Sequence, residues 1–176
     1  MRRWLFLLLL VVVLAFAFQR VVGSGGSSEE EKPAKPRAVA AIGNGEDAVA
    51  VGADGRLLRQ LPPPADDSLP ELPLADAPEK QRLGGTLLEQ VKVLAAAPPP
   101  LRPYLTRSYY GETGVDVELR SGIELRFGSS SQAARKWQAA ATVLADPSVT
   151  ALDYVDLHAP SHPSIGGSGH ELPPLP

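Results

Sequence analysis

Cysteine is absent from all 176 residues of the sequence. A disulfide framework and a thiolate metal site are therefore excluded, although an exported domain can still fold without disulfides. An excess of basic residues is also missing, because 17 Lys and Arg stand against 20 Asp and Glu, for a formal net charge of −3. Without Arg2, Arg3 and Arg20, which flank an apolar run, only 14 basic residues remain. Nucleic-acid binding needs a basic face, so the composition excludes that class of partner.

Patterns typical of catalysis, cofactor binding or metal binding are also missing. Pro160 separates His158 from His162, so these two histidines cannot share a helix face. Asp156 is the one carboxylate near them, and we interpret them as solvated histidines rather than zinc ligands. The glycine-rich stretches match no phosphate-binding loop, and no strand–turn–helix frames a nucleophile. We therefore predict no enzyme, no cofactor and no metal; an enzyme with an unrecognised site is an open alternative.

The N-terminus carries an unbroken apolar run at residues 4–18, preceded by Arg2 and Arg3. If Arg20 snorkels to the interface, the run extends to residue 22 and spans roughly 28 Å, close to the ~30 Å hydrocarbon core of a bilayer. The positive-inside rule then predicts cytoplasmic residues 1–3, a transmembrane anchor at 4–22 and an exported C-terminal part. A cleaved signal peptide is the rival interpretation, since Ala15-Phe16-Ala17 fits a cleavage site.

Composition divides the rest of the chain into three parts. Residues 23–37 are rich in Gly, Ser, Glu, Lys and Pro, which predicts a flexible tether. Residues 38–165 alternate apolar and polar segments and form the predicted folded domain. Residues 166–176 are polar and rich in Gly and Pro, which predicts a disordered tail.

Two hairpins are predicted from their turns. Strands at 38–42 and 48–52 are followed by a turn in which a left-handed Gly55 sets Val51 opposite Leu57. The alternating residues 115–119 and 123–127 form the second hairpin. Because facing residues lie on the same side of the sheet, a three-residue loop that ends in a left-handed Gly122 gives the consistent register. That register sets Val117 opposite Leu125.

The outer face of the second hairpin then pairs Asp116 with Arg126 and also Glu118 with Glu124. The second pair repels unless its side chains splay into water.

Two helices complete the predicted domain. The first follows Gly84-Gly85, with Thr86 as N-cap, Glu89 in a capping box, and an apolar stripe of Leu87, Leu88, Val91, Leu94 and Ala95. The second covers residues 131–146, with Ala134, Trp137, Ala141 and Leu144 on its apolar face. Further strands are predicted at 104–110 and 151–157, and Leu69, Leu72 and Leu74 are expected to pack on the domain. The predicted fold class is α+β, a mostly antiparallel sheet with two packed helices, preceded by one transmembrane helix.

The order of these segments resembles the extracytoplasmic β domain of the FtsQ/DivIB cell-division family over about residues 36–165. The segments that carry the resemblance are PRAVAAI, AVAVGADGRLLRQLP, ELPL, LLEQVKVL, VDVELRSGIELRFG, ARKWQAAATVLAD with Lys136 at a basic position, and YVDLHAP. In the last of these, Asp156 and Pro160 match the usual family form, whereas His158 and His162 replace arginines. The family normally carries a POTRA domain before its β domain, and here the fifteen-residue tether takes that place.

The resemblance implies a non-catalytic divisome scaffold in the bacterial plasma (inner) membrane that binds small bitopic coiled-coil division proteins. We expect partner binding by strand addition at the edge of the last predicted strand, at Tyr154, Val155, Asp156, Leu157 and His158. Alternatively, Val155 and Leu157 are core residues, the edge is covered, and Tyr154 makes only cross-strand contacts. An exported ligand-binding or envelope-structural module unrelated to division is the second functional hypothesis.

Overall fold

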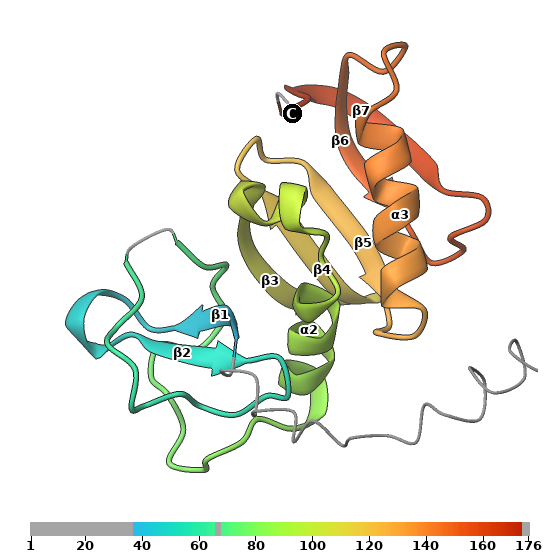
Figure 1. Ribbon diagram of the computed structural model, residues 1–176. Helices are drawn as coiled ribbons and strands as arrows, with labels where there is room; N and C mark the ends of the chain where they lie inside the picture. The colour runs from blue at the N-terminus through green and yellow to red at the C-terminus, as the bar shows by residue number, and fades with distance from the viewer. Residues whose placement is uncertain (1–36, 66–67, 174–176) are drawn as a thin grey trace, which may run out of the picture. The chain divides into compact units, whose positions relative to one another are not determined.

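The computed structural model describes residues 37–65 and 68–173 (Figure 1). Its elements follow in the order β1 (Ala38–Ile42), η1 (Gly45–Asp47), β2 (Val49–Gly52), α2 (Gly85–Ala95), η2 (Pro99–Tyr104), β3 (Leu105–Gly111), β4 (Gly114–Leu119), β5 (Glu124–Gly128), α3 (Ala133–Leu144), β6 (Ala151–Asp156) and β7 (Ser164–Glu171), where η denotes a 3-10 helix. This is the predicted α+β class. In these two ranges no helix is long and apolar enough to cross a membrane, and the predicted anchor at residues 4–22 lies outside them.

The first hairpin has the predicted turn. β1 and β2 pair antiparallel, and Val51 lies opposite Leu57. Gly55 has a φ of +81°, the left-handed conformation that the turn requires. Backbone bonds of 2.8 Å from Gly52 N to Arg56 O and from Leu58 N to Ala50 O fix the register.

The segment of residues 70–72, centred on Glu71, joins this hairpin to the larger sheet. Glu71 bridges Ala41 of β1 on one side and Arg107 of β3 on the other. Its N–H donates to Thr106 O at 2.9 Å, and its carbonyl accepts from Ser108 N at 2.9 Å. The adjacent Leu72 is only 3 % exposed and Leu74 packs against the core, as expected, whereas Leu69 is only partly buried and lies outside the core cluster.

The larger sheet has the strand order β3-β4-β5-β6-β7. The β4–β5 hairpin has the predicted register, with Val117 opposite Leu125, and Gly122 has a φ of +90°. β5 and β6 run parallel, and a parallel pair needs a long crossover connection, which here contains α3 (Figure 1). We call the face covered by α2 and α3 the inner face and the opposite one the outer face.

Both helices differ in detail from the prediction. α2 begins at Gly85 with Gly84 as N-cap and without a side-chain cap, so the predicted capping box of Thr86 and Glu89 is wrong. The Glu89 carboxylate instead accepts from Ser130 N at 3.2 Å and from Lys92 Nζ at 2.9 Å. Glu89 therefore accepts a hydrogen bond from Ser130, which is far away in the sequence, instead of capping its own helix.

On α3, Trp137 and Leu144 are buried as predicted, but the small residues beside them are Ala133 and Ala140, while Ala134 is exposed. Alanine occurs on both sides of the helix, so alanine alone cannot fix which face is buried. Lys136 is 3 % exposed and takes an inner position, because its ammonium donates to Phe127 O at 2.6 Å and to Ser129 O at 3.1 Å.

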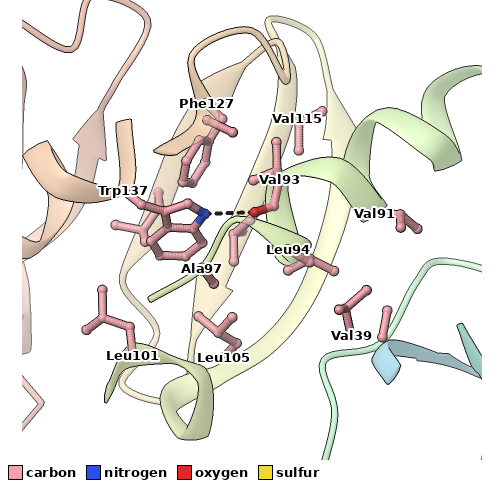
Figure 2. Close-up of a cluster of buried hydrophobic side chains, with 14 of the residues drawn as sticks. Val39, Val91, Val93, Leu94, Ala97, Leu101, Leu105, Val115, Phe127 and Trp137 are labelled. Carbon is pink, nitrogen blue, oxygen red and sulfur yellow. Dashed lines mark hydrogen bonds between the residues drawn. The ribbon is translucent and has the colours of Figure 1, made fainter. Parts of the chain in front are cut away.

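The core centres on Trp137, which links the two helices and the sheet. Its ring lies 4.8 Å from that of Phe127, tilted by 53°. Its Nε1 donates to Val93 O of α2 at 2.8 Å, the dashed line in Figure 2. Trp137 is 1 % exposed, so its one polar atom is satisfied inside an otherwise apolar environment.

The predicted disordered tail is wrong for residues 166–171, because Ser164–Glu171 forms β7, antiparallel to β6. Strand pairing uses main-chain groups and does not require apolar side chains. The glycines of β7 are needed because the Tyr154 and Asp153 side chains of β6 lie across them and leave no room for a Cβ. A Cβ on Gly166 would lie 2.5 Å from the Tyr154 hydroxyl, and Gly169 N donates to Asp153 Oδ1 at 2.8 Å.

Candidate functional site

The five predicted partner-binding residues do not lie at an edge of the sheet. β6 lies between β5 and β7, so the premise that its edge is open is wrong. Val155 and Leu157 are fully buried, Tyr154 and Asp156 are partly exposed on the outer face, and His158 follows the strand. The glycine-rich segment Ser164–Glu171, predicted to be mostly disordered, forms the strand that covers this edge.

The edge strand of this part of the sheet is β7. Of its residues, Gly166 is half-buried and the others are exposed, and Ile165 is 47 % exposed although it is large and apolar. Within residues 37–65 and 68–173 no strand pairs with its other side. The sequence offered one clue to β7, since Pro163 and Pro173 bound a stretch long enough for a strand.

The direction of the β7 backbone groups follows from a bond on the opposite side of β6. Leu157 N donates to Arg126 O of β5 at 2.8 Å. Backbone groups alternate in direction along a strand, so Tyr154 and Asp156 direct theirs toward β7. Their partners Gly166 and Ser164 face back toward β6. The N–H and C=O of Ile165 therefore point to the free edge.

Tyr154 makes cross-strand contacts. The Arg126 guanidinium lies 3.9 Å from the centre of its ring, and Gly166 lies opposite it on β7. Because a Cβ at Gly166 would collide with the Tyr154 ring, this glycine lets the ring lie across β7. The packing alternative considered from the sequence therefore describes Tyr154 in this structure.

The outer face carries a network of charged side chains. Glu118 and Glu124 are cross-strand neighbours, as predicted, and each carboxylate bonds to different partners. Glu118 pairs with Arg107 at 2.6 Å, whereas Glu124 accepts from Tyr109 and Arg126. Burial, followed by the hydrogen bond to Glu124, raises the pKa of Tyr109. Burial alone would raise the pKa of Glu124, but the bonds from Tyr109 and Arg126 lower it overall.

Asp116 is the buried acid of this face. It is 6 % exposed, and its Oδ1 has no hydrogen-bond partner among the described residues. Burial, with a smaller contribution from the Glu124 charge, raises the pKa of Asp116 to about 6, although Arg126 and His158 act in the opposite direction. Its predicted partner Arg126 lies opposite on β5 but forms its ion pair with Glu124.

His158 is exposed, as the sequence predicted, but its ring also contacts two hydrogen-bond acceptors. Its Nδ1 lies 2.8 Å from Asp156 Oδ1, and its Nε2 lies 3.2 Å from Thr113 O in the β3–β4 turn. The bond to Asp156 and then the bond to Thr113 raise the pKa of His158. Although burial alone would raise the pKa of Asp156, the two bonds from His158 lower it overall.

The described residues contain no group of three or more His, Cys, Asp or Glu placed to hold a metal ion. A hollow of about 520 Å³ lies beside α3 and the β6–β7 connection, lined by Gln132, Arg135, Gln138, Ala139, Thr142, Pro160 and Ser161. Its lining is partly polar and partly apolar and contains no acidic residue. Two features of the described residues can therefore bind a partner. They are the main-chain groups at the edge of β7 and the charged outer face of the sheet.

Comparisons with known proteins place the chain in a family. Its fold has some likeness to the major extracytoplasmic domain of the trans isomer of the bacterial cell division protein DivIB from Geobacillus stearothermophilus, with 21 % identity over 52 % of this chain and 76 % of that one and a TM-score of 0.37. No curated protein matches the chain. Residues 38–158 match the family "Cell division protein FtsQ/DivIB, C-terminal". This confirms the resemblance noted from the sequence: the chain belongs to the FtsQ/DivIB family of cell division proteins.

Proposed function

We propose that the protein is a non-catalytic scaffold of bacterial cell division that binds other division proteins through the free edge of β7. In this proposal, residues 4–22 anchor it in the plasma (inner) membrane with the N-terminus in the cytoplasm and the domain outside. Its partners are small bitopic division proteins that carry coiled coils, and it needs no cofactor. The family gives the cell-division role, and the edge of β7, with which no further strand pairs among the described residues, is the observation that supports the mode of binding.

The proposed edge is that of β7 and not of residues 154–158, because β6 is paired on both sides. A partner strand needs outward N–H and C=O groups, and Ile165 presents both. The glycines of β7 add little side-chain bulk beside that edge, so a second backbone can approach it closely. The exposed Ile165 side chain offers an apolar contact to the incoming strand.

The test compares three variants of the full chain, each used to capture partners from membranes of the native host. Ile165→Pro removes the outward donor, and we expect it to abolish capture while the domain stays folded. Ile165→Ala keeps the donor and should retain capture. Gly166→Pro removes an inward donor to β6 and should lower the melting temperature of the domain.

Loss of the same captured proteins in the Ile165→Pro variant, with their retention in Ile165→Ala, supports the proposal. If a folded Ile165→Pro variant captures the same proteins as the unmodified chain, the binding site lies elsewhere. If the captured proteins have no part in division, the scaffold function is wrong.

A further inference from the structure

His158 contacts three separate parts of the domain. Its ring bonds to Asp156 at the end of β6 and to the Thr113 carbonyl in the β3–β4 turn. Its own backbone N–H also donates to Asp156 Oδ1 at 2.9 Å. The ring lies against Gly128 at the end of β5, where a Cβ would collide with it. The contact therefore ties the β3–β4 turn to β5 and β6.

Both contacts of the ring can be hydrogen bonds in only one protonation state. The Thr113 carbonyl only accepts hydrogen bonds, and an ionised Asp156 carboxylate also only accepts. Both ring nitrogens must therefore carry a proton, which is the imidazolium form. A neutral ring has one donor and can keep only one of the two bonds. The carboxylate is the stronger acceptor, so the bond to Thr113 is the one lost.

We propose that His158 is a proton-dependent latch that holds the β3–β4 turn against the end of β6 when it is protonated and releases the turn when it is neutral. The proposal concerns the domain alone and stands whether or not β7 binds a partner. It rests on the two acceptors that flank the ring and on the fit of the ring over Gly128.

The groups that face the latch favour the protonated ring on balance. Asp156 stabilises the imidazolium, and Lys136 of α3 opposes it. Asp116 of β4 also interacts with His158, and it is in turn surrounded by Glu124, Arg126 and Asp156. Tyr109 of β3 faces the same cluster. Acids thus outnumber the bases around the ring.

The direction of the pH effect follows from the raised pKa of His158. Stability from the latch is fully present below the unfolded value near 6.5 and is lost as the pH rises through the raised folded value. Asp116 acts in the same direction but at lower pH, between its ordinary pKa of 3.8 and its folded pKa of about 6, so His158 dominates above about pH 6. The β3–β4 turn should therefore loosen as the pH rises from about 5.5 to 8.5.

The experiment uses the full chain and two readouts. The imidazole resonances of His158, followed by NMR, should titrate with a pKa above 6.5. Amide exchange at residues 111–114, corrected for intrinsic base catalysis, should increase at least several-fold relative to residues 115–119 over the same pH range. A His158 pKa at or below 6.5, or a turn equally protected at both ends of the range, would overturn the proposal.

Two variants distinguish the effect of the His158 titration from that of the Asp116 titration. His158→Arg supplies a permanent cation, so protection of the turn should no longer depend on the histidine titration. Asp116→Asn removes the neighbouring titration and should leave the latch intact. If His158→Arg keeps the wild-type pH dependence while Asp116→Asn abolishes it, Asp116 alone is responsible and the latch is wrong. The wild-type NMR titration remains decisive if a variant fails to fold.

Discussion

The inner and outer faces of the β3–β7 sheet are stabilised by different interactions. On the inner face, Val117, Leu125 and Val155 are fully buried under the helices, and Trp137 fills the centre. On the outer face, residues at alternate positions are charged or aromatic, and Arg107–Glu118 and Arg126–Glu124 form ion pairs. Apolar burial depends little on pH, whereas charged contacts depend on pH and salt. The inner face should therefore set the total stability, and the outer face its response to conditions.

The largest expected effect is on the inner face. Trp137→Ala should lower the free energy of unfolding by about 3–5 kcal/mol, because it leaves a cavity and removes the donor to Val93 O. Urea unfolding at pH 7 measures this loss. The matched control is Gln138→Ala on the exposed side of α3, expected within about 0.5 kcal/mol of the unmodified protein. Equal losses in the two variants would contradict the assignment of the inner face.

The turn at Gly122 sets the register of β4 against β5. A shift of one residue in this register would move every inner side chain of one strand to the outer face. Gly122→Val should cost well over ~1 kcal/mol, because a β-branched residue is strained at the φ of +90°. Its Cβ would also lie 2.6 Å from the His170 ring. Gly84→Ala, at a glycine with φ −142° and open space around it, is the control and should cost less than about 1 kcal/mol, the effect of alanine at a helix N-cap.

The outer face should show its pH response at Asp116. Asp116→Asn removes a buried charge, so at pH 8 we expect the variant to be more stable on the order of 1–3 kcal/mol. At pH 4 the wild-type carboxyl is protonated in the folded state, because its pKa is about 6, and the two proteins should be nearly equal. Chemical denaturation at both pH values gives the comparison. A gain that does not change with pH would point to altered packing instead.

The smallest expected effect is at an exposed ion pair of the outer face. Arg107→Gln removes the partner of Glu118 and should cost less than about 1 kcal/mol, since surface pairs are screened by water and salt. Thermal melts at low salt and at 1 M salt should differ less in the variant than in the wild type. A cost of several kcal/mol would mean that charged contacts, and not only burial, carry the stability of the sheet.

The sequence predicted those parts of the fold that local residues determine. Gly55 and Gly122 fixed their turns because a left-handed position demands glycine, and alternation then gave the register. The position of β7 depends on β6, whose Tyr154 and Asp153 lie against its glycines, and composition alone suggested disorder.

The candidate site was harder to predict because it also depends on contacts between residues that are far apart in the sequence. The burial of Asp116 and the contact of His158 with Thr113 join residues from separate strands and turns. Tyr154 and Asp156 were placed in the correct strand, but whether that strand had a free edge depended on the segment after it.

The most direct test of partner binding at β7 is the exchange rate of a single amide. Hydrogen exchange of the Ile165 N–H in the full chain, measured alone and with the captured division partner, reports whether that edge becomes paired. We predict rapid exchange alone and strong protection in the complex, with Gly166 protected in both states. An Ile165 amide that is already protected alone, or that stays unprotected in the complex, would contradict strand addition at β7.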